Sequence, residues 1–433
     1  MENRAKFPIM VAKAIKDAFG KDFLVEMQVS GEEDDGLTIE DIVTFAKLAE
    51  GYIDPEKGVN SVEEALQGAN DIIAEDLSDD ADIRKSLREL VMRRGMLTCT
   101  AAEDAEADGV YKLYYDFSQP ISRVLDHQIL AMNRGEKEGV LKPNVILAGN
   151  EGAALVCRAA LKPTMQVSAF VRAAAEDAYE RLIFPSIQRE VRSDLSDRAY
   201  AGAIRNFALN LKPLLMQPPV KGFVTMGLDP GYRNGCKVAV VDATGKVLAT
   251  TVVYPTFSER KKQEAISSLS VLMRKYGVKH IAIGNGTASR ETEAMTVELL
   301  KSFPEASYMI VSEAGASVYS ASPLAAEEFP DYDVNLRSAV SIARRLQDPL
   351  AELVKIDPKA IGVGQYQHDC PQKELDAALG AVVEDCVNAV GVDANTASRS
   401  LLQQVSGLTA TTAKNIVAYR EENGPFTSRA QLK

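Results

Sequence analysis

The spacing of hydrophobic and polar residues changes along this chain, and the changes divide it into parts. From Ser61 apolar residues recur every three or four positions, and Ser61-Val-Glu-Glu64 is a capping box that predicts the start of a helix. A second helix is predicted to end at Arg93-Arg94-Gly95, where arginine suits the negative helix end and Gly95 can form a left-handed cap. Helical spacing returns over about 121–134 and 167–211, with an interruption at Pro185.

Beyond Pro218-Pro219 the pattern becomes typical of strands. Three strands are predicted over 223–229, 236–242 and 247–253, the last two joined by a hairpin turn at Gly245. Helices and strands then alternate: helix 258–275, strand 279–283, helix 289–301, strand 307–313 and helix 336–347. Three antiparallel strands followed by alternating helices and parallel strands is the order of a ribonuclease H-like mixed sheet.

These patterns predict a multidomain protein that combines an α-helical part with an α/β part. At about 150 residues per domain, 433 residues are too many for one core. We predict four segments: an orphan βα piece at 1–52, a helical scaffold at 53–218, the ribonuclease H-like domain at 219–357 and a helical region at 358–433.

Composition narrows the function classes. Five widely spaced cysteines and three distant histidines disfavour a disulfide framework or a histidine-rich metal site, and no apolar run is long enough for a membrane span. The sequence thus predicts a cytoplasmic protein without membrane partners. The net charge of −12 disfavours a wholly basic nucleic-acid-binding surface but leaves local patches open.

A first group of candidate residues follows the ends of the predicted strands. Asp229, in Gly-Leu-Asp-Pro-Gly, and Glu313, after the fifth strand, are candidate catalytic carboxylates, with Asp229 as a metal ligand. A two-metal nuclease needs about three carboxylates, but Asn285 follows the fourth strand and Arg337 begins the last helix, where acids are expected.

Two interpretations of this group remain open. One is a nucleic-acid-binding relic of a nuclease site, with no required cofactor and with Arg233 and Lys237 contacting phosphates. The other is a Mg²⁺- or Mn²⁺-dependent nuclease or resolvase-like hydrolase, if Asp333, Glu384 or Asp385 completes the site.

A second candidate site lies near the end of the sequence. The stretch 401–420 reads as two short helices joined by Ser-Gly407-Leu, a helix-hairpin-helix whose second helix offers backbone amides to a phosphate. Residues 399–433 hold five basic and two acidic side chains, and we expect Gly407, Lys414 and Arg420 to bind RNA or DNA without sequence preference. A plain packing hairpin is the alternative.

Several strings are typical of one family: GLDPGYRNGCKVAVVD at 227–242, IAIGNGTASRETE at 281–293 and GLTATTAKNIVAYREENG at 407–424. On these, residues of about 54–433 resemble the Tex family of transcription accessory proteins. The resemblance implies a helical scaffold, a YqgF-type ribonuclease H-like domain, helix-hairpin-helix modules, and RNA, DNA and the transcription machinery as partners. The family's N-terminal helix-turn-helix region and C-terminal oligonucleotide-binding barrel are not in this sequence, so we expect a truncated chain.

The first 52 residues are similar instead to an interior fragment of the old yellow enzyme family of flavin oxidoreductases. Where that family reads V-R-x-S beside the flavin, this chain has Met27-Gln28-Val29-Ser30, which disfavours flavin binding and an oxidoreductase function. We therefore expect a chimeric reading frame with its junction near Tyr52-Ile53-Asp54.

Overall fold

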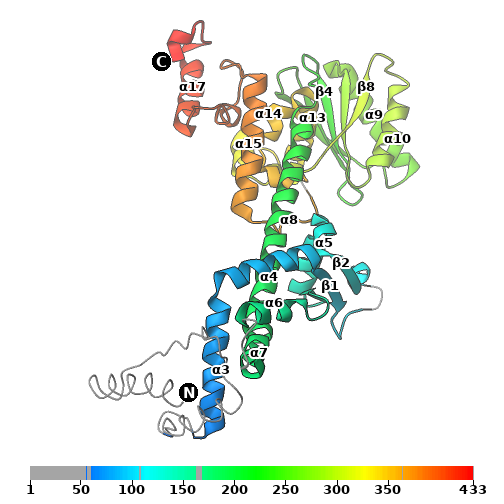
Figure 1. Cartoon of the computed structure of the whole chain (residues 1–433). Helices are drawn as coiled ribbons and strands as arrows, with labels where there is room; N and C mark the ends of the chain where they lie inside the picture. Colours follow the sequence, from blue (N-terminus) through cyan, green and yellow to red (C-terminus); the bar gives the residue numbers. More distant parts are fainter. Residues whose placement is uncertain (1–54, 56–59, 107–108, 162–167, 363, 433) are drawn as a thin grey trace. The chain divides into compact units, whose positions relative to one another are not determined.

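The computed structural model describes residues 55, 60–106, 109–161, 168–362 and 364–432. The expectations for segment 1–52 lie outside these residues. Contacts between Cα atoms divide the chain into two compact units, Met1–Ala199 and Tyr200–Lys433. Figure 1 shows the course of the chain within each.

The first unit begins with the two predicted helices, α3 (Val62–Asp79) and α4 (Ala81–Arg94). As predicted, the Ser61 hydroxyl caps α3 by accepting the amide of Glu64 at 3.2 Å. The left-handed cap predicted at Gly95 is wrong, because Gly95 has φ −66°. Glycine is needed there for space, since a Cβ would overlap the Val91 carbonyl and lie 2.7 Å from Ile121 Cδ1.

A small sheet, absent from the sequence prediction, lies within this largely helical unit. Strands β1 (Met96–Ala101), β2 (Asp116–Pro120) and β3 (Leu141–Ile146) pair antiparallel in the order β2-β1-β3. The strands have only five or six residues, and β3 contains Pro143, which an edge strand tolerates because one side of it needs no partner. The shorter elements around them are η3 (Lys112–Tyr114), η4 (Ile121–Arg123), α5 (Asp126–Lys137) and α6 (Glu151–Ala160).

At the interruption predicted at Pro185, the helix continues but its pitch changes just before the proline. Helix α7 (Ser168–Asp177) passes through a π-helical segment, η5 (Ala178–Ile183), directly into α8 (Phe184–Leu215). Proline lacks an amide hydrogen and crowds the preceding turn, and the wider π turn accommodates this without ending the helix. The helix is therefore continuous where a break was expected.

The second unit contains the predicted mixed sheet in the predicted order. Its strands are β4 (Thr225–Asp229), β5 (Cys236–Val241), β6 (Val247–Val253), β7 (His280–Gly284) and β8 (Ser307–Val311), arranged β6-β5-β4-β7-β8. β4, β5 and β6 pair antiparallel, whereas β7 and β8 run parallel to β4. This confirms the ribonuclease H-like order.

Helices cover both faces of this sheet (Figure 1). On one face α9 (Glu259–Tyr276) and α10 (Ser289–Leu300) pack with Leu269, Met273 and Met295 over the buried strand residues. On the other, α13 (Val334–Gln347) packs small side chains, including Ala339 and Ala343, against β5. α13 comes so close to β4 that a Cβ on Gly227 would overlap the Ala339 carbonyl.

Further helices complete the second unit. They are α11 (Ala316–Ser320), α12 (Pro323–Glu328), α14 (Pro349–Leu353), η6 (Pro358–Ile361), α15 (Gln372–Val390), α16 (Arg399–Leu402), α17 (Ala410–Asn423) and η7 (Arg429–Leu432). None of the helices in the described ranges is long and apolar enough to cross a bilayer.

Candidate functional site

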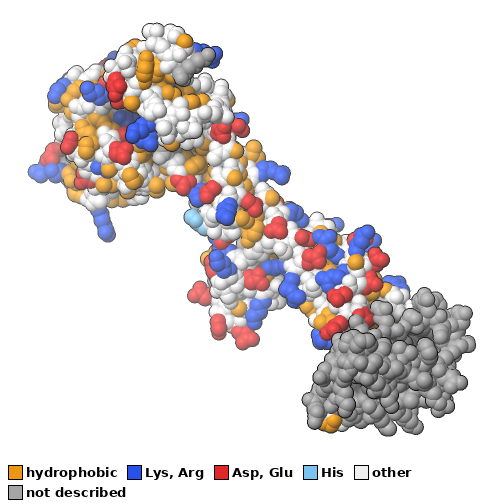
Figure 2. Space-filling model, turned by 90° about the vertical axis from the view of Figure 1, so that its left-hand side faces the viewer, with side chains coloured by type: hydrophobic (Ala, Val, Ile, Leu, Met, Phe, Trp, Pro, Cys, Tyr) orange, Lys and Arg blue, Asp and Glu red, His pale blue; other side chains and the backbone are white. Residues whose placement is uncertain are grey.

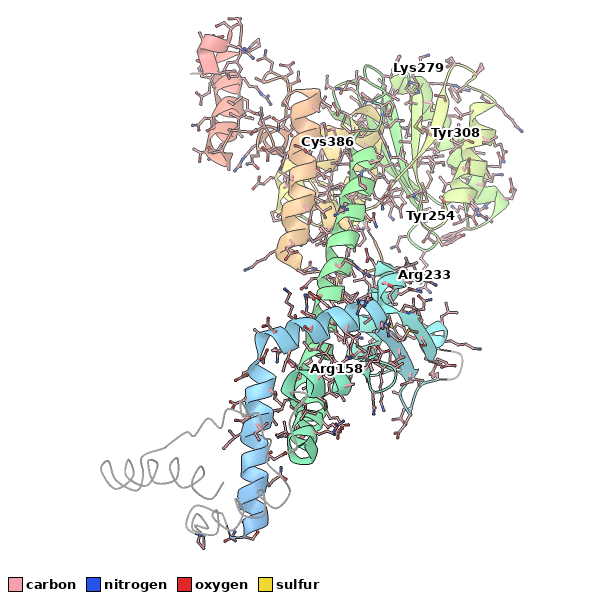
Figure 3. All side chains as sticks on the ribbon, in the orientation of Figure 1. Arg158, Arg233, Tyr254, Lys279, Tyr308 and Cys386 are labelled. Carbon is pink, nitrogen blue, oxygen red and sulfur yellow. The ribbon has the colours of Figure 1, made fainter. Side chains whose placement is uncertain are left out.

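Three parallel strands bring the predicted polar residues to one edge of the mixed sheet. Asp229 ends β4, Asn285 follows β7 and Glu313 follows β8, so all three lie at the carboxyl edge. In Figure 3 Arg233 and Tyr254 lie at this edge and Lys279 at the opposite one. Arg233 is exposed, in the loop after Asp229.

Asp229 has two polar neighbours in direct reach. The Ser338 hydroxyl, from α13, donates to its Oδ2 atom. Lys237 is its direct partner in the antiparallel ladder, so the two side chains share a face of the sheet, and Lys237 Nζ lies 3.8 Å from the same oxygen. Both side chains are largely buried, at 13% exposure for Lys237 and 16% for Asp229.

Glu313 faces the same space from β8. A Cβ on Gly284 would lie 2.9 Å from Glu313 Oε2 and 3.3 Å from the ring of Pro230, the residue after Asp229. Burial and the charge of Asp229 raise the pKa of Glu313, while a hydrogen bond from the Gly286 backbone and the nearby Lys237 cation oppose the rise. We call Asp229, Lys237, Glu313 and Ser338 the acidic cluster.

The loop that carries Glu313 is held by two side chains behind it. The Asn285 side-chain oxygen Oδ1 accepts the Glu313 backbone amide at 3.0 Å, and the Asn285 backbone amide donates to the Val311 carbonyl at 3.0 Å. Arg345, only 3% exposed, donates from Nη1 to the carbonyls of Ser312 and Ala314 at 2.7 and 2.8 Å. Asn285 therefore shapes the loop, and its carbonyl oxygen is already engaged.

The expectation that Arg337 occupies the site is wrong. Its Nη1 donates to the Ser320 carbonyl at 3.3 Å, toward α11, and the next residue, Ser338, contacts Asp229. Successive side chains on a helix point about 100° apart. Arg337 and Ser338 are neighbours on α13, so an error of one position in the sequence prediction puts a cation where the structure has a hydroxyl.

The acids proposed to complete a metal site have other environments. Asp333 is the N-cap of α13 and accepts the Asn335 amide at 2.8 Å, while Glu384 and Asp385 are exposed on α15. Within the described ranges no three His, Cys, Asp or Glu side chains lie close enough together to hold a metal ion. Two carboxylates already facing an ammonium do not fit the donor set of a two-metal nuclease.

The second candidate site is a compact helical hairpin. Helices α16 and α17 enclose a small core of Ala397, Leu402 and Ala413, and the turn between them has Gly407 at φ +85°. Thr409 caps α17 by accepting the Thr412 amide at 3.1 Å. This is the helix-hairpin-helix predicted from the sequence, with the α17 N-terminus directed to the turn.

The cations of the hairpin have different surroundings. Lys414 is exposed, on the second turn of α17. Arg420 is partly buried, and its Nη1 donates to the Ala394 carbonyl at 2.9 Å, so it also holds the hairpin together. The Asn395 amide, which sequence reasoning missed, pairs with both backbone groups of Phe426, accepting at 2.7 Å and donating at 3.0 Å.

Charge over the rest of the visible surface is mixed. Figure 2 shows Lys and Arg interspersed with Asp and Glu, without a wide region of one sign on that face. Many exposed cations are paired with acids, as in Arg181 with Asp71 and Asp177. Arg192 and Arg198 are paired in the same way, with Glu136 and Asp126, so these positive charges of the 181–205 stretch are neutralised locally.

Family comparisons match three parts of the chain. The Tex central region-like model matches residues 43–207, the Tex protein YqgF-like domain model matches 223–347 and the helix-hairpin-helix motif model matches 387–433. The first match begins inside the segment that we assigned to a flavoenzyme-like fragment.

Similar full-length sequences agree with these matches. "Uncharacterized protein YdcI" of Bacillus subtilis (strain 168) is 50% identical over 90% of the chain and 55% of its own length. "Transcriptional accessory protein Tex" of Neisseria gonorrhoeae is 47% identical over 89% of the chain and 51% of its length. The human "S1 RNA-binding domain-containing protein 1" is 41% identical over 88% of the chain and 40% of its length.

The chain thus spans about half the length of these two bacterial relatives. The two Tex models together match more than half of its residues, in the order and positions of the helical part and the mixed-sheet domain. With a helix-hairpin-helix following them, this chain belongs to the Tex family.

Proposed function

We propose that this chain is the nucleic-acid-binding core of a transcription accessory protein, that it holds RNA or DNA through the α16–α17 hairpin, and that its YqgF-like domain does not hydrolyse the strand. The observation that carries the proposal is the hairpin itself: a Gly407 turn, a capped helix N-terminus and an exposed Lys414 one turn further on. The names of two relatives, which mention transcription and RNA binding, support it.

The chemistry of the hairpin suits a phosphate backbone. Amides in the first turn of α17 have no carbonyl partner within the helix and point along a dipole that favours an anion. The Lys414 ammonium adds a flexible point charge close by. These contacts recognise sugar-phosphate rather than base edges, so we expect binding without sequence preference.

The test is fluorescence anisotropy with two unrelated single-stranded RNAs and a DNA duplex. Lys414→Glu should weaken binding several-fold for all three, because it replaces a phosphate contact with repulsion. Lys373→Glu makes the same charge change at an exposed position at the start of α15, outside the hairpin, and is the matched control. Equal losses in the two variants would show that only net charge matters and would refute the hairpin as the contact site.

The nuclease alternative is not favoured by the donors at the carboxyl edge. Asp229 and Glu313 supply two carboxylates, and Lys237 lies against Asp229 on the same face of the sheet. We expect no cleavage of structured RNA or DNA with Mg²⁺ or Mn²⁺. Cleavage that Asp229→Asn abolishes would reverse this assignment.

The origin of residues 1–52 is a separate proposal. We infer that they derive from a flavoenzyme reading frame joined to a Tex-family frame within residues 43–53, between the start of the Tex match and the junction expected from the sequence. An uninterrupted sequencing read across the Tyr52 codon tests this. If the read shows a continuous Tex-family frame upstream of this codon, the junction is an artefact of assembly. If the fused frame is recovered again from independent samples, the junction is real and the artefact is contradicted.

A further inference from the structure

The cation within the acidic cluster comes from the chain itself. Sheet register places Lys237 directly opposite Asp229, and Nζ lies 3.8 Å from Asp229 Oδ2 with both side chains more than four-fifths buried. The backbone near the ammonium is also close, since a Cβ on Gly231 would lie 3.5 Å from Nζ. The ammonium is therefore held at the cluster by strand pairing and by the surrounding loop.

We propose that the Lys237 ammonium takes the place of a divalent cation in the acidic cluster, so that the wild-type cluster rejects Mg²⁺ and Mn²⁺, and that removing this one positive charge turns the cluster into a divalent-cation site. The inference deepens the proposed non-hydrolytic role of the YqgF-like domain and rests on it. It assigns Lys237 to charge balance within the protein rather than to phosphate binding.

Charge and geometry both support this assignment. Two carboxylates beside each other repel, and burial strengthens that repulsion because water screens it less. An ammonium near both offsets it, as a metal ion does in a hydrolase of this fold. A metal ion bound to Asp229 Oδ2 at about 2 Å would lie within about 6 Å of Nζ, and two cations at that separation in a largely buried site repel strongly.

The remaining ligands explain why loss of the ammonium would create a site. Asp229 and Glu313 would then face each other with Arg345, behind Glu313, as the remaining cation near that carboxylate. Carboxylate oxygens are the preferred ligands of Mg²⁺ and Mn²⁺. The Ser338 hydroxyl and water could supply neutral oxygens. Two carboxylates make such a site one of modest affinity.

Mn²⁺ titration followed by electron paramagnetic resonance of the free ion tests the proposal on the full chain without nucleic acid. Wild type and Asp229→Asn should bind Mn²⁺ equally, at background level. Lys237→Met, which keeps an unbranched side chain one atom shorter and removes the charge, should gain about one bound Mn²⁺. Lys237→Met/Asp229→Asn should lose it. Lys237→Arg keeps the cation and should not gain the ion.

Thermal unfolding gives a second readout. Without metal, the melting temperature of Lys237→Met should be below that of wild type. At a Mn²⁺ concentration ten times the dissociation constant it should rise by about 3–6 °C, while the melting temperature of wild type should not change. One Mn²⁺ bound by wild type and lost in Asp229→Asn would overturn the proposal, whether or not Lys237→Met folds. A folded Lys237→Met that binds none would also overturn it.

These outcomes are independent of the hairpin. Mn²⁺ binding to wild type would refute the internal-cation role and reopen the nuclease alternative, while binding of RNA or DNA through Lys414 would stand. Failure of Lys414→Glu to affect nucleic-acid binding would refute the hairpin contact and leave the Mn²⁺ result unaffected.

Discussion

Replacing Gly227 by alanine tests the packing that builds the acidic cluster. Gly227 is in the middle of β4, and a Cβ there would lie 2.8 Å from the Ala343 amide nitrogen and 2.9 Å from the Ala343 Cβ, with the Ala339 carbonyl closer still. Ordinary van der Waals contacts begin near 3.4 Å. Two of these three atoms are backbone, so no side-chain rotation relieves the overlap, and α13 must move away from the sheet.

That movement has a cost in stability and a local consequence. Overpacking of a tight interior contact costs about 1–3 kcal/mol, and we expect the upper part of this range because rigid backbone is displaced. At about 2–4 °C per kcal/mol, the melting temperature of the second unit should fall by about 4–12 °C. Ser338 precedes Ala339 on α13, so its hydroxyl should also lose contact with Asp229.

The assay is thermal unfolding together with hydrogen exchange of the peptides that contain β4 and α13. Gly380→Ala is the matched control, because Gly380 lies within α15 with no atom near its Cβ position. Alanine should stabilise that helix by about 0.5–1 kcal/mol. A Gly227→Ala protein that melts at or above the wild-type temperature, with unchanged exchange in α13, would refute the close approach of helix and strand.

Three further predictions concern single groups. The pKa of Glu313 is raised in the folded state, so its negative charge lowers the free energy of unfolding once the pH rises above the pKa of the unfolded chain. Glu313→Gln should therefore be more stable than wild type at pH 7–8, by about 1.4 kcal/mol for each unit of pKa difference, but not near pH 4. Thermal melts at the two pH values test this, and an effect independent of pH would contradict it. Asn395→Ala should lower the free energy of local unfolding of the chain after Gly424 by about 1–3 kcal/mol, because both hydrogen bonds to Phe426 are lost. Proteolysis there should be faster than in wild type, and an unchanged cleavage rate would count against this. All five described cysteines are buried, and burial raises the pKa of Cys236 to about 12, so iodoacetamide should label them only on unfolding; rapid labelling of native protein would be inconsistent with that packing.

The mixed sheet could be predicted from the sequence because its signals are local. The hairpin at Gly245, the alternation of apolar positions and the capping Ser258 of α9 each determine one element independently of the rest of the fold. The hairpin near Gly407 was predictable for the same reason, since a left-handed glycine between two short apolar helical segments carries its own signature. Placement of Asp229, Asn285 and Glu313 at one edge followed from the parallel order of their strands.

What could not be predicted depends on contacts between distant residues. The role of Ser338 depends on which residue of α13 faces β4, and the close packing at Gly227 that sets this is not visible in the periodicity of α13 alone. Lys237 was expected to contact phosphate. It is eight residues after Asp229 in sequence, and this separation gives no sign of the ladder register that places its ammonium 3.8 Å from the carboxylate. The sheet β2-β1-β3 was missed because β2 and β3 each contain a proline and several polar residues, so neither reads as an apolar strand.

The salt dependence of nucleic-acid binding tests the central proposal most directly. For wild type and Lys414→Glu, the logarithm of the association constant for one RNA is measured against the logarithm of salt concentration, in EDTA. The proposal predicts a linear dependence for wild type and a slope about 0.7 smaller in magnitude for Lys414→Glu, the change for one lost phosphate contact on a single strand. Identical slopes would contradict the hairpin as the surface that holds the nucleic acid.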